Sequence, residues 1–229
     1  MVRRFTKTVM KKFTYPLFLF MILGFAACSQ KTNRPTVLPK QLSSKELSKY
    51  SEATFAAGCF WHEEALFESI KGVKEVVSGY AGGTTANPTY ESIETGETGH
   101  TETVNVYYDP AEVKYETLVQ VYFAGQDPTS VNGQGNDRGT QYRSVLFYRN
   151  NQEKQMANTY MKQLQQSGKY KKPLAVQIMH LTKFWNAEGY HQDYIVKNPG
   201  SGYVNMVSIP EIKKTQKEYP KLIKAGHQF

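Results

Sequence analysis

The sequence predicts an α+β protein, a two-layer sandwich in which helices cover a mixed β-sheet with a ferredoxin-like core. Segments with strand and helix patterns alternate along the chain in the order β-α-β, β-α-β, α-β. Hydrophobic residues make up 40% and aromatic residues 13% of the 229 residues, which is enough for one sizeable core. No internal repeat is visible, and the composition excludes a disordered chain, a collagen-like chain and a coiled coil.

The first four elements precede residue 110. Residues 54–57 form a short apolar strand pattern, and residues 63–70 follow with apolar positions three and four apart, the spacing of a helix. Residues 73–80 are predicted as a second strand that leads into a glycine-rich loop. Residues 101–108 alternate between two faces, and Glu102 shares its face with two valines. A carboxyl on an otherwise apolar strand face needs an explanation.

The remaining elements continue the alternation. Residues 115–124 carry an amphipathic helix pattern, and residues 142–148 follow as a strand after a loop rich in Gly, Asn and Asp. A longer helix is predicted over 151–167 and a strand over 174–181. A short helical segment over 187–194 precedes irregular turns, so the elements form one domain.

The N-terminus is predicted to be an export signal. Residues 1–27 begin with basic side chains, continue with an apolar run and end in small residues before Cys28. The apolar run is too short for a membrane-spanning helix. The sequence FAAC at 25–28 resembles the lipobox of bacterial lipoproteins, although Phe25 stands where that family more often has Leu. The resemblance implies lipidation of Cys28 and an extracytoplasmic, membrane-anchored protein.

The rest of the chain divides into three parts. Residues 28–50 lack a sustained apolar period and are predicted to be a flexible tether. Residues 51–210 hold the folded domain, and residues 211–229 form a basic C-terminal tail. The formal charge of +8 comes from the two ends, because residues 51–210 contain 13 basic and 17 acidic side chains. We therefore expect no nucleic-acid-binding face on the domain.

Cys59 is the one cysteine within the predicted domain. It follows a strand and Gly58 and directly precedes a helix pattern, so its sulfur should face free backbone N–H groups and the positive end of the helix dipole. Both features favour the thiolate, and they predict a lowered thiol pKa and a reactive sulfur. A lone cysteine in a domain is otherwise most often a small buried hydrophobe.

Six ordered motifs identify a family. The chain resembles the peptide methionine-S-sulfoxide reductases, the MsrA family, over residues 52–195. The matching motifs are GCFW at 58–61, GYAGG at 79–83, NPTY at 87–90, TGHTE at 98–102, GNDRGTQYRS at 135–144 and AEGYHQ at 187–192. The resemblance implies an MsrA-like fold and an enzyme that reduces methionine-S-sulfoxide in proteins and peptides.

The resemblance also assigns catalytic roles. Cys59 matches the thiolate that attacks the sulfoxide sulfur, releases methionine and becomes a sulfenic acid, the reversible first rung of thiol oxidation. Glu102 matches the proton donor, and burial among aromatic side chains should raise the pKa of its carboxyl. Tyr90 and Tyr142 match the phenols that bind the sulfoxide oxygen. Asp137 matches a carboxylate in the same pocket.

Three more residues are implied to bind the substrate. Phe60 and Trp61 match the aromatic pocket for the substrate methyl group, and sulfur–aromatic contacts contribute roughly 0.3–1.5 kcal/mol each. His191 matches a family motif near the pocket, where packing is as good an explanation as chemistry. Neither a metal nor a bound cofactor is implied.

The same residues leave room for other functions. A cysteine hydrolase would pair Cys59 with a histidine base such as His100 or His191, but it leaves the aromatic pair and the carboxyl unexplained. A zinc site on the helix that begins near residues 62–64 would need a second histidine four residues after His62, and none is there. A nucleotide-binding loop is also excluded, because the glycines of residues 133–139 do not have its spacing. A non-catalytic surface lipoprotein that binds peptides through its aromatics stays open.

The chain departs from the family at its C-terminus. Many members place further cysteines there to resolve the sulfenic acid, whereas residues 184–229 contain none. With Cys28 lipidated, the sulfenic acid of Cys59 needs an external thiol, either a thioredoxin-type protein or a small thiol. The expected partners are therefore oxidised proteins or peptides, this reductant and the membrane, and the protein is expected to be a monomer.

Overall fold

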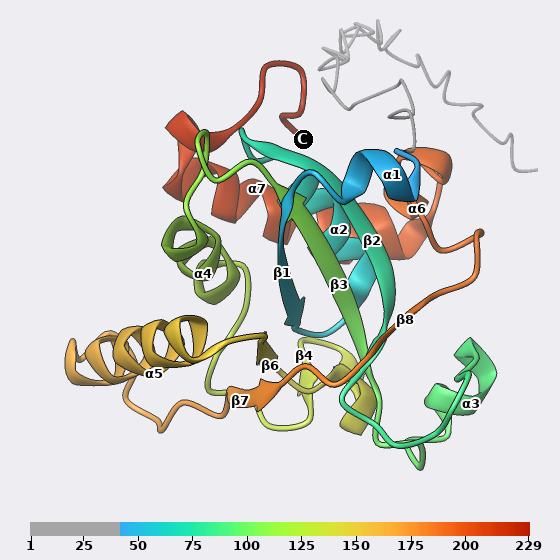
Figure 1. Ribbon diagram of the computed structural model, residues 1–229, viewed down its shortest axis with the longest axis horizontal. Coiled ribbons are helices and arrows are strands. Elements are labelled where there is room, and N and C mark those ends of the chain that lie inside the picture. The colour runs from blue at the N-terminus through green and yellow to red at the C-terminus, as the bar shows by residue number, and fades with distance from the viewer. Residues whose placement is uncertain (1–41) are drawn as a thin grey trace, which may run out of the picture. The chain divides into compact units, whose positions relative to one another are not determined.

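The computed structural model describes residues 42–229 (Figure 1). The predicted export signal, the lipidation site Cys28 and the tether as far as residue 41 lie outside the described residues. Within the described part, no helix is long and apolar enough to cross a membrane.

A six-stranded mixed sheet forms the centre of the domain, in the order β7-β6-β1-β3-β2-β8. Only β6 and β7 pair in parallel; the other neighbours are antiparallel. The bounds are β1 Ser51–Ala56, β2 Val73–Ala81, β3 Thr101–Tyr108, β6 Val145–Tyr148, β7 Gln177–His180 and β8 Phe184–Asn186. A separate hairpin joins β4 Gly133–Gln134 to β5 Asp137–Arg138.

Seven α-helices accompany the strands within the described residues. Their bounds are α1 Ser44–Leu47, α2 Phe60–Glu68, α3 Tyr90–Glu94, α4 Tyr115–Ala124, α5 Asn151–Gln166, α6 Tyr194–Lys197 and α7 Ile209–Glu218. A π-helical turn over Val204–Ser208 leads into α7, and 3₁₀ turns cover Thr140–Tyr142 and Pro220–Leu222.

The ferredoxin-like core is present. The chain runs β1-α2-β2-β3-α4-β6, with the short α3 inserted before β3, and the four strands lie in the order β6-β1-β3-β2. Each of these neighbours is antiparallel, which is the split β-α-β arrangement. β7 and β8 extend this core at its two edges. The predicted fold class is confirmed.

One face of the sheet packs against α2 and α4. The ring of Phe55 on β1 stacks on Phe67 of α2 and on Tyr122 of α4, with both pairs of ring centroids 5.0 Å apart. Tyr122 also donates its hydroxyl to the carbonyl of Ala56 at 3.1 Å. Both helices therefore cover the same face of the sheet, as a two-layer sandwich requires.

The opposite face of β1 and β3 is polar. Thr54 donates its hydroxyl to Oδ1 of Asn105 at 2.7 Å, and Arg149 donates to the same oxygen and to Oε2 of Glu52. Because side chains alternate along a strand, this face is opposite Phe55. Most of these polar atoms satisfy one another, while Nη1 of Arg149 has no partner among the described residues.

The C-terminal residues belong to the domain. The predicted boundary between a domain ending at 210 and a tail over 211–229 falls inside α7, whose Ile212 is fully buried. Beyond α7, the backbone of Leu222 accepts the N–H of Lys71 at 2.7 Å, and the N–H of Lys224 bonds the carbonyl of Ser69 at 2.8 Å. Figure 1 shows α7 in red beside α2. Basic residues on an otherwise packed helix explain why composition suggests a tail.

Smaller differences concern short elements. Helix α1 lies within the segment expected to be a tether, and it carries a capping box between Ser43 and Glu46. Residues 187–188 are irregular, residues 189–193 form turns, and the helix begins only at Tyr194. Helix α3 and strand β8 have too few residues to show a period in the sequence.

Candidate active site

Cys59 lies where β1 turns into α2. The preceding Gly58 has φ +71°, a left-handed conformation that glycine adopts without strain, and a Cβ there would lie 2.7 Å from Cβ of Gln134. Cys59 is the N-cap residue of α2 and makes no capping hydrogen bond with its side chain. The turn therefore places the sulfur at the start of the helix, as the sequence predicts.

The predicted lowering of the Cys59 pKa is wrong. The side chain is 8% exposed, and burial raises the pKa of the thiol well above its ordinary value. The nearby Glu102 carboxyl raises it further when ionised. The backbone N–H of Trp61 and the hydroxyl of Tyr203 act in the opposite direction, but they do not outweigh burial. The N–H groups at the start of α2 thus lower the pKa of the thiol, but desolvation raises it by more.

Glu102 faces this thiol from β3. The side chain is 2% exposed, and its Oε2 accepts the backbone N–H of Phe60 at 2.9 Å. Burial raises the pKa of the carboxyl well above its ordinary value, and the hydrogen bonds from Phe60 and Cys59 only moderate the rise. The predicted raised pKa is confirmed. A carboxyl that keeps its proton at neutral pH is able to donate it.

Tyr90 and Tyr142 lie in the electrostatic environment of Glu102. Tyr90 begins α3, and its phenol interacts with both Glu102 and Cys59. Tyr142 closes the turn before β6, and its hydroxyl donates to Oε1 of Glu94 at 3.1 Å. Burial raises the pKa of both phenols, so they stay protonated and can act as hydrogen-bond donors.

Asp137 adjoins the thiol through a residue that sequence reasoning missed. The hydroxyl of Tyr203 donates to Oδ2 of Asp137 at 2.5 Å and also contacts the sulfur of Cys59. Burial raises the pKa of Asp137, while this hydrogen bond lowers it. Tyr203 lies beyond the last recognised motif, in a region predicted as irregular turns, and no local signal separates it from the other 15 tyrosines.

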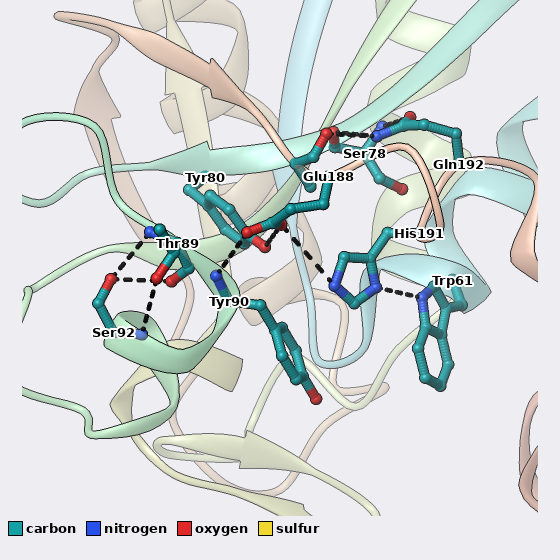
Figure 2. Close-up of polar contacts among 10 residues, drawn as sticks. Trp61, Ser78, Tyr80, Thr89, Tyr90, Ser92, Glu188, His191 and Gln192 are labelled. Carbon is teal, nitrogen blue, oxygen red and sulfur yellow. Dashed lines mark hydrogen bonds and ion pairs between the residues drawn. The ribbon is translucent and has the colours of Figure 1, made fainter.

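Phe60, Trp61 and His191 form an aromatic cluster beside the thiol. Nε1 of Trp61 donates to Nδ1 of His191 at 3.1 Å (Figure 2). The imidazole ring lies 4.8 Å from the ring of Phe60. Tyr90 lies 4.6 Å from the same imidazole. Because Nδ1 accepts a hydrogen bond, neutral His191 carries its proton on Nε2. Burial lowers the pKa of His191, which favours this neutral form.

Trp61 is held on its other side by Tyr194 of α6. The two rings stack with centroids 3.6 Å apart and an angle of 6° between their planes. The indole of Trp61 is thus held twice by this segment, by a hydrogen bond to His191 and by stacking on Tyr194. The segment forms no regular element before Tyr194.

Glu188 connects this cluster to the sheet, as Figure 2 shows. Its carboxylate accepts the hydroxyl of Tyr80 at 2.8 Å and the backbone N–H of Tyr90 at 3.0 Å, and lies 3.9 Å from Nε2 of His191. Burial alone would raise the pKa of Glu188, but these hydrogen bonds lower it below the ordinary value. The motif AEGYHQ already contained Glu188, although sequence reasoning assigned it no role.

Cys59 also borders a pocket. A pocket of about 610 Å³ is lined by Cys59, His62, Asp137 and Tyr203, together with one face of α7. Phe60, Trp61 and Tyr142 do not line it. The sulfur is therefore buried but accessible, since it forms part of a pocket wall. No three His, Cys, Asp or Glu side chains among the described residues are placed to hold a metal ion.

The structure thus brings together every predicted site residue that it describes. Cys59 and Glu102 face each other, the aromatic cluster of Phe60, Trp61 and His191 lies beside them, and the two predicted phenols share the electrostatic environment of Glu102. Asp137 adjoins the sulfur through its hydrogen bond with Tyr203. Cys28 lies outside the described residues.

Comparisons with known proteins agree with this geometry. The family model described as peptide methionine sulfoxide reductase matches residues 51–223. The chain is 41% identical over 183 residues to a protein named peptide methionine sulfoxide reductase MsrA from Polynucleobacter asymbioticus, covering 80% of this chain and 96% of the relative. It is 43% identical over 164 residues to a protein of the same name from Picrophilus torridus, covering 72% and 92%.

Solved structures show the same relationship. Methionine sulfoxide reductase A of Corynebacterium diphtheriae is 36% identical, with a TM-score of 0.59 over 66% of this chain and 76% of that one. Reduced Mxr1 from Saccharomyces cerevisiae is 30% identical, with a TM-score of 0.61 over 66% and 87%. The family match extends past residue 210, in agreement with the packing of α7. The chain belongs to the peptide methionine sulfoxide reductase family.

Proposed function

We propose that this protein reduces methionine-S-sulfoxide in proteins and peptides to methionine, with Cys59 as the nucleophile. The observation that carries the proposal is the pairing of a buried thiol with a buried, protonated carboxyl, Glu102, beside an aromatic cluster. A nucleophile next to a proton donor is what a sulfoxide requires, because its sulfur is attacked while its oxygen must be protonated.

The reaction balances on these two groups. Sγ of Cys59 attacks the sulfoxide sulfur while Glu102 gives its proton to the sulfoxide oxygen. The oxygen is transferred to Sγ as a sulfenic acid, methionine leaves, and Glu102 recovers a proton from the thiol. The enzyme sulfur is oxidised by two electrons and the substrate sulfur is reduced by two. Since both groups hold their protons before substrate binds, the resting pair is neutral.

The surrounding residues orient the substrate. The protonated phenols of Tyr90 and Tyr142 donate hydrogen bonds to the sulfoxide oxygen, and the rings of Phe60 and Trp61 hold the methyl group. His191 fixes the indole of Trp61 through its Nδ1. Since the two sulfoxide epimers are served by separate enzyme types, the expected substrate is the S epimer.

The sulfenic acid is then reduced by an external thiol. Cys59 is the only cysteine among the described residues, and the sequence contains one other, Cys28. The pocket wall keeps the sulfur accessible to a second reactant. A thioredoxin-type protein or a small thiol supplies the electrons.

Export and anchoring complete the proposal. The motif FAAC at 25–28 supports lipidation of Cys28, which would hold the enzyme on the extracytoplasmic side of a membrane as a monomer that repairs oxidised proteins there. Globomycin should block processing in a bacterial host, and Cys28→Ala should release the enzyme from the membrane fraction. If the signal is still cleaved in the presence of globomycin, the lipidation of Cys28 is contradicted.

The activity is tested on peptides that carry one sulfoxide epimer each. Without reductant, the enzyme should form about one methionine per Cys59 from the S epimer and none from the R epimer. Dimedone should then label Cys59. Cys59→Ser should form no methionine, whereas Cys28→Ser should match the unmodified enzyme. Equal yields from both epimers, or turnover by Cys59→Ser, would contradict the proposal.

A further inference from the structure

The pocket of about 610 Å³ beside Cys59 has no role in sulfoxide binding as described above. Its walls come from the end of α4, the β4–β5 hairpin, residues 203–208 and α7, whereas the aromatic cluster lies between α2, α3 and α6. Tyr203 separates the two spaces: its hydroxyl bonds Asp137, and its ring meets Trp61 edge to face at 6.1 Å. Cys59 therefore borders this pocket in addition to adjoining the aromatic cluster.

One face of α7 forms a long wall of this pocket. Glu211, Lys214, Thr215 and Glu218 all line it, and they are spaced three, four and seven residues apart, which places them on one stripe of the helix. Lys217 lies on a different face of the same helix and lines another depression. The volume falls in the range of roughly 300–1,000 Å³ typical of small-molecule sites.

The inner wall carries a buried imidazole without a well-formed hydrogen bond. His62 is 5% exposed, and neither ring nitrogen has a partner of good geometry among the described residues, although the backbones of Gly125 and Ser208 lie close enough to act on it. Burial lowers its pKa to about 4, so the imidazole is neutral at pH 7. Its closest charged neighbour is the Glu211 carboxylate, 3.7 Å from Nδ1. Buried polar atoms are normally satisfied, so an imidazole left open in the wall of a pocket indicates a polar ligand or water there.

The charges around the pocket favour an anionic group on that ligand. Four carboxylates among the described residues line the pocket, and each has a neighbour that engages it: Asp137 accepts from Tyr203, Asp127 accepts from the backbone of Thr129, and Glu218 pairs with Lys169 at 3.6 Å. The fourth, Glu211, lies 3.7 Å from Nδ1 of His62 and is attracted by Lys214.

The cations are less engaged. Within the described residues the ammonium group of Lys214 has neither a hydrogen bond nor an ion pair, although it attracts Glu211. Arg138 makes one long contact, 3.4 Å to Ser130. A ligand carboxylate would have these two cations available.

We propose that this pocket is the binding site for the reductant, a small thiol that carries a carboxylate, and that it reaches Cys59 from the side opposite the sulfoxide. The proposal rests on the proposed function, since it concerns the step that follows methionine release. Substrate and reductant would then use separate entrances to one sulfur.

The step balances with two thiol molecules. The first thiol loses its proton and its sulfur attacks Sγ of Cys59; an S–S bond forms, the S–O bond breaks, and the hydroxide leaves as water with that proton. A second thiol attacks the ligand sulfur of the mixed disulfide and releases the Cys59 thiol. Two thiols are oxidised to one disulfide, and the sulfenic acid is reduced by two electrons.

The experiment separates the two half-reactions. Methionine formation without reductant is measured first, and it tests the proposed function alone. The oxidised enzyme is then mixed with 3-mercaptopropionate or with 2-mercaptoethanol, and the loss of dimedone-reactive sulfenic acid is followed against thiol concentration. The two probes are similar in size and differ in the carboxylate.

Lys214→Trp should narrow the pocket and slow sulfenic acid reduction by both thiols at least about tenfold. Lys214→Glu should slow sulfenic acid reduction by 3-mercaptopropionate about three- to tenfold and leave reduction by 2-mercaptoethanol unchanged. The reason is that it replaces an attractive exposed charge with a repulsive one. In both variants, methionine formation should stay unchanged. Lys214 is exposed, so both proteins should fold, and their melting temperatures verify this.

Lys217→Trp and Lys217→Glu are the matched controls, with the same changes on another face of α7; both should behave like the unmodified enzyme. Unchanged reduction by Lys214→Trp would overturn the pocket as the entrance. If Lys214→Glu slowed sulfenic acid reduction by the two thiols equally, the proposed preference for a thiol with a carboxylate would be overturned. An unmodified enzyme that forms no methionine would refute the proposed function instead, at a step before any thiol is added.

Discussion

The carboxyl group of Glu102 accepts the backbone N–H of Phe60, the residue after Cys59, over 2.9 Å. Cys59 itself supplies no capping side-chain bond to α2, so Glu102 satisfies one of the N–H groups left free at the start of this helix. The same carboxyl faces the thiol. One contact between β3 and α2 therefore fixes the distance between the nucleophile and the proton donor.

Glu102→Gln should separate the capping role from the proton donor. Glutamine can still accept the N–H of Phe60 but carries no acidic proton, so the fold should persist while methionine formation in a single turnover slows by roughly 10²–10⁴-fold. Rapid quench of the reductant-free reaction measures this rate. Glu97→Gln, at an exposed position, is the control. A rate equal to that of the unmodified enzyme would move proton donation to a tyrosine or to water.

Stability should fall with rising pH because of Glu64. Burial raises the pKa of this carboxyl from 4.5 to about 8. Between these two values the unfolded chain has lost the proton and the folded protein has kept it, so the free energy of unfolding decreases as pH rises.

Glu64→Gln should remove this part of the pH dependence. The loss of unfolding free energy between about pH 5 and pH 8, measured with urea, should shrink by roughly 1–3 kcal/mol. Glu116→Gln, an exposed change on α4, should leave the loss as it is. An equal loss in Glu64→Gln would mean that Glu64 is ionised in the folded protein.

The Trp61–His191 hydrogen bond should be visible in a double-mutant cycle. His191→Phe leaves the indole N–H of Trp61 without its acceptor, which should cost about 1–3 kcal/mol of unfolding free energy and raise KM for a sulfoxide peptide. In a Trp61→Phe background the same change should cost less, since the donor is already gone. Strict additivity of the two changes would argue against the bond. His180→Phe, on the exposed end of β7, serves as the control.

Gly58→Ala should disturb the turn that presents Cys59. The new Cβ would meet Cβ of Gln134 at 2.7 Å, and alanine is strained at φ +71°, so stability should fall by more than about 1 kcal/mol and methionine formation should slow. Gly168→Ala is a matched control, because Gly168 has φ +73° with nothing within 4 Å of the added Cβ. If both variants lose the same stability, backbone strain alone explains the effect, and the clash with Gln134 does not contribute.

Sequence patterns predict those helices and strands whose own side chains carry a clear hydrophobic period. The strand over 101–108 and the helix over 115–124 match β3 and α4 to the residue, since alternation and helical spacing are written in their own side chains. β8 is different: its three residues are a strand because they pair with β2, and no period reveals that. The lysines of α7 suggested a tail, and only its packing shows that it is part of the domain.

By itself, the sequence determined the fold class, the family and the residues that meet at the site, because ordered motifs and a thiol at a helix start are properties of neighbouring residues. The tertiary structure alone decided the protonation of Cys59, the links through Tyr203 and Glu188, and the pocket that borders Cys59. Desolvation and charge depend on which distant segments close around a group, and that closure exists only in the folded protein.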